Sequence, residues 1–127
     1  MSQQRPRSRA SARKAGTSFE TVVASYLAEH VDDRIERRTR NGSKDRGDVS
    51  GLRHMGGRIV VECKNTARLN LSGWLAEAET ERGNDDAMAA VVVHKRHGKA
   101  APGEQLVTMR LADLVALLTG SRPEEDA

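Results

Sequence analysis

The residues of this chain best placed to do chemistry are two acids and a lysine, Asp48, Glu62 and Lys64. The apolar run at 59–61 predicts a strand covered on both faces, so charges at its end need a partner or a cation. A Mg²⁺ ion bridging the two carboxylates would offset their repulsion. Lys64 would then orient a metal-bound water or stabilise charge on a phosphate. The alternative is an ordinary ion pair between Lys64 and one of the acids at the rim of a sheet.

A predicted β-hairpin brings these residues together. Its strands are expected at 48–52 and 58–63, and the glycines at 56–57 predict the tight turn, because such turns need positive φ values. A hairpin centred near residue 55 pairs Asp48 with Glu62. Side chains alternate along a strand, so Lys64 shares one face with both acids, while the odd-numbered residues of the second strand point to the other.

The motif resembles that of the PD-(D/E)XK nuclease superfamily: Asp48, a hairpin-length gap, then Glu62-Cys63-Lys64 after β-branched residues. The order of predicted elements over about residues 16–120 is similar to that of archaeal-type Holliday junction resolvases. Gly47 stands where the superfamily usually has proline, as it often does in the resolvase branch. The resemblance implies a restriction-endonuclease-like fold, a three-layer α/β sandwich with a central mixed β-sheet flanked by helices.

The same resemblance implies roles for individual residues. The expected catalytic residues are Glu20, Asp48, Glu62 and Lys64. A Mg²⁺ ion, with Mn²⁺ as a possible substitute, would be held by Asp48, Glu62 and the backbone carbonyl of Cys63.

Basic residues in the first half of the chain are candidates for DNA contacts. They lie in the basic N-terminal segment, in the loop before Asp48, where Ser43 matches a functional serine of resolvases, and after Lys64. The expected DNA-binding residues are Arg13, Lys14, Arg40, Ser43, Lys44, Arg46 and Arg68. A solubilising leader and a merely solvated loop are the alternatives.

Glu20 has two interpretations. The sequence Thr17-Ser18-Phe19-Glu20 is a capping-box pattern, which predicts a helix from about Thr17 to His30 with Glu20 closing the box. The family resemblance instead makes Glu20 an acid of the first helix that joins the metal site. The two roles are not exclusive.

Length and composition indicate one domain with a single core, because the chain has 127 residues. One cysteine excludes an internal disulfide, and no apolar run approaches the roughly 20 residues of a membrane span, so an intracellular, cytoplasmic protein is expected. Cys63 is expected to be a small buried residue. Residues 1–68 hold 15 basic and 8 acidic residues, and residues 69–127 hold 6 and 10, which favours a polyanionic ligand for the first half.

The expected organisation is a disordered basic tail at 1–16, a nuclease domain at 17–120 and an acidic tail at 121–127. Further strands are predicted at 31–39, 87–93 and 105–110, and helices at 71–82 and 111–118. In the helix at 71–82, Trp74 is expected in the core, with Glu77, Glu79 and Glu81 forming the polar side.

The leading functional hypothesis is therefore a Mg²⁺-dependent, structure-selective DNA endonuclease that acts on branched DNA. The alternatives are another nicking or repair endonuclease of the superfamily, and a non-catalytic DNA-binding protein on the same fold. The intact acids argue against the last. A two-fold homodimer is expected, because the helix at 111–118 is apolar around more than half its circumference and a four-way junction has two equivalent strands to cut.

Overall fold

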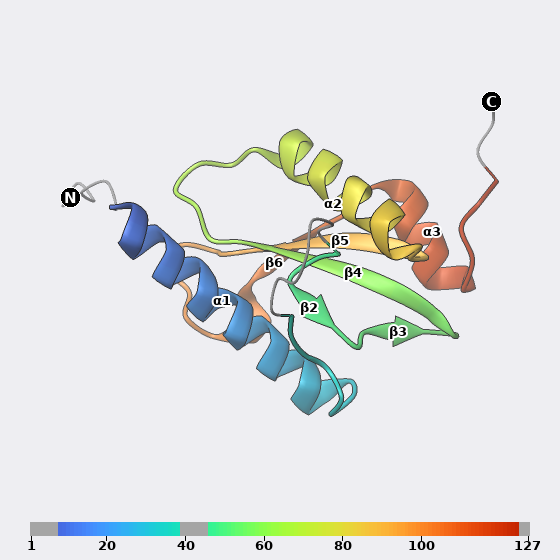
Figure 1. The fold of residues 1–127 in the computed structure, drawn as a ribbon, viewed down its shortest axis with the longest axis horizontal. Coiled ribbons are helices and arrows are strands. Elements are labelled where there is room, and N and C mark those ends of the chain that lie inside the picture. Colours follow the sequence, from blue (N-terminus) through green and yellow to red (C-terminus); the bar gives the residue numbers. More distant parts are fainter. Residues whose placement is uncertain (1–7, 39–45, 125–127) are drawn as a thin grey trace.

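The computed structural model describes residues 8–38 and 46–124, which build three helices around one mixed β-sheet (Figure 1). The helices are α1 (Arg9–His30), α2 (Leu71–Asp85) and α3 (Leu111–Thr119), with a short 3₁₀ turn, η1, at Pro102–Glu104. The strands are β1 (Glu36–Arg37), β2 (Val49–Ser50), β3 (Arg53–His54), β4 (Gly57–Lys64), β5 (Ala89–His94) and β6 (Leu106–Thr108). None of the three helices has the length and apolar character needed to cross a membrane.

The sheet has the strand order β1-β2-β4-β5-β6, and β3 pairs with β4 outside this path. The β4–β5 pair is parallel, whereas the pairs on either side of it are antiparallel. The predicted α/β class and mixed sheet are confirmed. The strand predicted at 31–39 is much shorter, because only Glu36–Arg37 pairs with β2, and residue 39 lies outside the described residues.

β4 is the buried centre of the sheet, and helices cover both of its faces. Ile59, Val61 and Cys63 belong to the cluster that includes Phe19 of α1 and Ala116 of α3. Val60 packs in a second cluster with Trp74 and Ala78 of α2. This arrangement, with α2 on one face and α1 and α3 on the other, is compatible with a three-layer sandwich. The expected burial of Trp74 and of Cys63 is confirmed.

The hairpin has the predicted register at the end where the acids lie, since Val49 pairs with Val61. Its turn differs from the prediction. Met55 and Gly56 have the positive φ values, of 50° and 84°, and Gly57 begins β4 instead. His54 pairs with Gly57, so the register at the turn differs by one residue from that at Val49.

A bulge at Gly51 absorbs this difference. Gly51 has a φ of 88° and separates β2 from β3, so the single strand predicted at 48–52 is divided in two. The bulge therefore restores the pairing that brings Asp48 beside Glu62.

α1 begins earlier than predicted. The predicted start at Thr17 and the disordered tail through residue 16 are wrong for residues 9–16, which are helical. The segment is rich in alanine, arginine and lysine, which favour helix. Ser8 caps it by accepting a hydrogen bond from the Ser11 amide at 3.1 Å. Residues 1–7 of the basic tail lie outside the described part of the chain.

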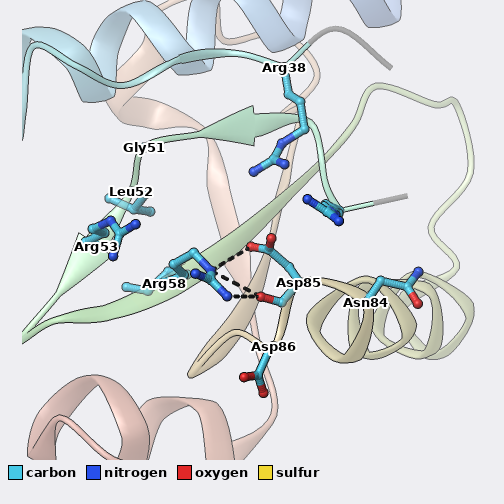
Figure 2. A pocket seen from close by; sticks show the side chains of 10 residues that line it. Arg38, Gly51, Leu52, Arg53, Arg58, Asn84, Asp85 and Asp86 are labelled. Carbon is cyan, nitrogen blue, oxygen red and sulfur yellow. Dashed lines mark hydrogen bonds and ion pairs between the residues drawn. The ribbon is translucent and has the colours of Figure 1, made fainter. Parts of the chain in front are cut away.

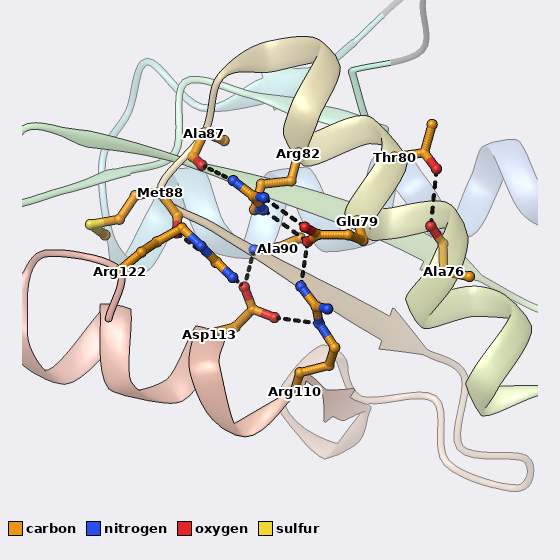
Figure 3. A network of polar contacts seen from close by, with 10 residues as sticks. All are labelled: Ala76, Glu79, Thr80, Arg82, Ala87, Met88, Ala90, Arg110, Asp113 and Arg122. Carbon is orange, nitrogen blue, oxygen red and sulfur yellow. Dashed lines mark hydrogen bonds and ion pairs between the residues drawn. The ribbon is translucent and has the colours of Figure 1, made fainter. Parts of the chain in front are cut away.

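A network of charged side chains fastens α3 to α2 and β5 (Figure 3). Asp113, only 2% exposed, accepts hydrogen bonds from Arg122 at 2.7 Å and from the Ala90 amide at 3.2 Å. Arg110 pairs with both Asp113 and Glu79. Because Arg122 is held here, the predicted tail at 121–127 starts later than expected, and residues 125–127 lie outside the description. The network thereby fixes the position of α2.

Alanine substitution at Gly51 and Gly56 tests the bulge. Both residues have positive φ, where a side chain costs about 1–2 kcal/mol. A Cβ at Gly51 would also lie 2.8 Å from the Arg34 carbonyl oxygen, while at Gly56 nothing lies within 4 Å. Gly51→Ala should therefore lower the free energy of unfolding, measured by urea denaturation, by clearly more than Gly56→Ala. Equal losses would contradict the bulge.

Candidate active site

An acidic hollow opens where β4 ends, between α1 and α2. Its lining includes all four predicted catalytic residues, together with Cys63 and Glu77. Glu20 comes from α1, Asp48 directly precedes β2, and Glu62 and Lys64 are the last residues of one face of β4. The fold thus brings together side chains that are separated by up to 44 positions in the sequence.

Backbone hydrogen bonds hold Asp48 against β4. Its amide donates to the Val61 carbonyl at 2.9 Å, and its carboxylate accepts from the Cys63 amide at 2.8 Å. The amide and the carbonyl of a residue in an extended strand point to the same edge. The Cys63 carbonyl, a predicted metal ligand, is therefore directed to the edge on which Asp48 lies.

Gly47 is required immediately before Asp48. It is buried with a φ of 97°, and a Cβ there would lie 3.1 Å from the Val61 carbonyl oxygen and 2.9 Å from Val60. A proline ring fixes φ near −65°, so the proline typical of the nuclease superfamily cannot adopt this backbone conformation. The chain therefore has glycine instead of proline before Asp48 because the backbone there has a positive φ.

The two carboxylates at the centre of the hollow repel each other. Burial, and next the charge of Glu62, raise the pKa of Asp48 to about 8, although the hydrogen bond from Cys63 opposes the rise. Glu62 is 4% exposed, and its Oε2 atom has no hydrogen-bond partner among the described residues. A buried carboxylate oxygen without a partner is unfavourable, and a cation would supply one. Two carboxylates and a carbonyl are hard oxygen ligands that fit Mg²⁺ or Mn²⁺.

Lys64 lies between two carboxylates. Its Nζ atom is 2.8 Å from Oε2 of Glu77 and 3.4 Å from Oε1 of Glu62. Burial works against the charge of Lys64, but the Glu77 hydrogen bond and the Glu62 charge outweigh it and raise its pKa. Lys64 is therefore an ammonium group at neutral pH, able to stabilise negative charge and unable to act as a base. The ion pair with Glu62 that the sequence suggested as an alternative is present.

Two further acids, Glu77 and Glu81 of α2, adjoin the hollow. Carboxylate oxygens of Glu62, Glu77 and Glu81 all lie within 4.8 Å of one another. The expectation that Glu81 belongs to the polar side of the helix is wrong, since it is 1% exposed. The signal for this was in the sequence, because Glu81 follows Trp74 and Ala78 at i+7 and i+3, on one face of a helix.

Glu20 lies in the hollow, away from any helix end. The capping box predicted for it is wrong, because Thr17 is inside α1. Its Oε2 atom accepts a hydrogen bond from Nε of Arg37 at 3.1 Å. The charge of Glu20 also contributes to the raised pKa of Asp48. Glu20 thus acts electrostatically on the centre of the site.

The structure describes four of the seven predicted DNA-binding residues. Arg13 lines the acidic hollow, and Lys14 is exposed on α1. Arg68 is exposed on the connector between β4 and α2, and Arg46 lines a neighbouring pocket. The remaining three, Arg40, Ser43 and Lys44, lie outside the described residues.

The raised pKa of Asp48 predicts a pH-dependent stability in the absence of metal. The folded protein retains a proton that the unfolded chain releases above its ordinary pKa of 3.8. With EDTA, the free energy of unfolding should therefore fall as pH rises from about 4 to about 8, by up to a few kcal/mol. Asp48→Asn should lack this decline, and Mg²⁺ should reverse it in the wild type at pH 8. The same decline in Asp48→Asn would contradict the assignment.

A scan against models of known protein families finds no match for this chain, and neither the curated proteins nor the solved structures compared with it give one. The resemblance to the nuclease superfamily remains a prediction from the sequence, carried by Asp48, Glu62 and Lys64 and by the order of the predicted elements.

Proposed function

We propose that the protein is a Mg²⁺-dependent DNA endonuclease that hydrolyses phosphodiester bonds in branched DNA, similar to a Holliday junction resolvase. One observation carries the proposal. The carboxylates of Asp48 and Glu62 share a poorly solvated hollow beside the ammonium group of Lys64, and Oε2 of Glu62 has no partner among the residues described. Such a set is unfavourable by itself and becomes favourable around a divalent cation.

The chemistry follows from the donor set. Asp48, Glu62 and the Cys63 carbonyl would hold the ion, which when bound polarises a phosphate oxygen and makes a coordinated water more acidic. Lys64, held by Glu77 at 2.8 Å, stabilises the negative charge that develops on the phosphate. Burial, followed by the charge of Asp48, raises the pKa of the Cys63 thiol, so it stays protonated and does not compete as a nucleophile.

A nucleic-acid substrate is supported by the distribution of charge. Arg13 lies in the hollow and Lys14 next to it on α1, within the half of the chain that carries 15 basic and 8 acidic residues. Phosphates are the ligands that such a surface attracts. The preference for branched DNA rests on the resemblance to resolvases, and a nicking or repair endonuclease is the alternative with the same chemistry. A non-catalytic DNA-binding protein would not need the acids.

A two-fold dimer is part of the proposal, and an exposed apolar stripe supports it. Leu111, Leu114 and Leu118 of α3 recur at i, i+3 and i+7 and are 76%, 40% and 75% exposed. Leu106 and Val107 of the neighbouring edge strand β6 are also exposed. α2 does not cover these leucines within the chain, because each of them is at least 40% exposed. A symmetric pair would cover the stripe and present two sites to a junction.

Substitution of the acids tests the chemistry. Asp48→Asn and Glu62→Gln should each lower the Mg²⁺-dependent cleavage rate by on the order of 10²-fold or more, as the loss of one electrostatic group does. The affinity of each variant for DNA in EDTA should stay nearly unchanged. Asp33→Asn, an exposed acid outside the hollow, is the matched control and should cut normally. Labelled duplex, flap and four-way junction serve as substrates. Wild-type rates in either site variant would contradict the proposal, and equal cutting of all substrates would favour the repair endonuclease.

The dimer is tested by sedimentation equilibrium at micromolar protein. Leu118→Lys should convert a dimer to a monomer, because it places a charge in the apolar stripe. Leu69→Lys is the matched control, since Leu69 is 72% exposed and lies on the connector before α2, outside the stripe. A wild-type protein that is monomeric both alone and bound to a junction would exclude paired cutting.

A further inference from the structure

We propose that an arginine pocket beside the acidic hollow binds internal phosphates of the DNA strand that enters the active site. The pocket is lined by four arginines, Arg38, Arg46, Arg53 and Arg58, and by residues 84–86 at the end of α2. Figure 2 shows the pocket from close by. The inference rests on the proposed function for the identity of the polymer. It adds a second binding site, three of whose four arginines were not expected to contact DNA.

The pocket and the acidic hollow lie on the same face of the sheet. Arg58 and Glu62 are alternate residues of β4 with Val60 between them, and Val60 packs against α2. Arg58 reaches the end of the same helix, where it bonds to the Asp85 carbonyl at 3.1 Å. Four residues of strand span about 13 Å, so Arg58 and Glu62 are that far apart along β4.

Arg38 connects the two sites, because it lines both of them. Its Nε atom is buried and has no hydrogen-bond partner within residues 8–38 and 46–124. Figure 2 shows its guanidinium directed into the pocket. A buried donor without an acceptor is unfavourable, and an anion in the pocket would satisfy it.

The arginines differ in how much of their charge is available. Arg58 is occupied, since it pairs with Asp85 through both the carbonyl and the carboxylate. The side chains of Arg38, Arg46 and Arg53, by contrast, make no hydrogen bond or ion pair to another part of the described chain. Three guanidinium groups around one pocket repel each other unless an anion lies between them. The four arginines of the lining outnumber its two aspartates, Asp85 and Asp86, so the lining carries a net charge of +2.

Guanidinium groups favour phosphate, because their planar donors match its oxygens in pairs. Arg53 pairs with Arg58 across β3 and β4, so it lies about as far from Glu62 along β4 as Arg58 does, and this spacing fits one continuous strand. A distance of about 13 Å corresponds to about four nucleotides at a rise of about 3.4 Å per nucleotide of one strand. One DNA strand can therefore place one phosphate at the cation site beside Glu62 and another phosphate, some nucleotides away, among the arginines.

The test measures DNA binding without metal, so that it does not depend on cleavage. The full chain with Arg38→Gln or Arg53→Gln is titrated with a short labelled duplex in EDTA at a series of salt concentrations. Each substitution should reduce the slope of log affinity against log salt by about 0.9, the value for one lost phosphate contact. Arg34→Gln is the matched control and should leave the slope unchanged, because Arg34 is exposed and engaged by Asp32 at 2.8 Å. Circular dichroism checks that each variant is folded.

The outcomes separate this inference from the proposed function. Unchanged slopes in both variants would overturn the proposal that the arginine pocket binds phosphates. Mg²⁺-dependent cleavage by the wild type, measured separately, tests whether the protein is an endonuclease. Duplexes with and without 5′-terminal phosphates should respond alike. An effect confined to the phosphorylated duplex would overturn the assignment to internal phosphates. If Arg38→Gln fails to fold, Arg53→Gln decides, since Arg53 is exposed and lies outside the acidic hollow.

Discussion

Repulsion between the carboxylates of Asp48, which is half-buried, and Glu62, which is buried, is the constraint on which the rest of this structure depends. Pairing of β2 with β4 brings Asp48 beside Glu62, where burial and their mutual charge raise the pKa of Asp48 to about 8. The fold maintains this contact by several independent means. β4 is buried on both faces, and Gly47 and Gly51 adopt backbone conformations that few other residues tolerate. The fold holds two carboxyl groups so close together that the pKa of Asp48 is raised to about 8, and a bridging cation that replaces the proton is the simplest role for such a pair.

The surrounding charges are arranged by distance from that centre. Lys64 is adjacent and is held between Glu62 and Glu77, so its ammonium group stays beside the carboxylates. Farther along the same face of β4, arginines replace acids, and Arg38 lies between the two zones. Acidic residues at the centre with basic residues around them suit a polyanionic ligand. The arginines attract the phosphates, and a cation bound by the carboxylates can bind one of these phosphates.

The sequence predicts the contacts that follow from the alternation of side chains along a strand and from the number of residues between paired positions of a hairpin. Equal distances from residue 55 predict that Asp48 pairs with Glu62, and the structure has that register. The residues of the turn are shifted by one position, and the extra residue of the bulge at Gly51 compensates for the resulting change of register. The burial of Glu81 could also have been predicted, from its place on the face of Trp74 and Ala78. The Lys64–Glu77 and Glu20–Arg37 pairs could not, because they join elements whose relative placement is set by packing of the whole sheet. The early start of α1 departs from the prediction because charge and low hydrophobicity indicate disorder for this segment, whereas its alanines and the Ser8 cap favour helix.

The central claim is that Asp48 and Glu62 share a divalent cation, and a crystal grown with Mn²⁺ tests it most directly through anomalous scattering. The account predicts an anomalous peak in contact with both carboxylates and with the Cys63 carbonyl, at about the 2.1 Å typical of small hard cations. The peak should be absent from crystals of Asp48→Asn. An ion bound only by Glu77 and Glu81, or an acidic hollow without an ion at saturating Mn²⁺, would contradict the account.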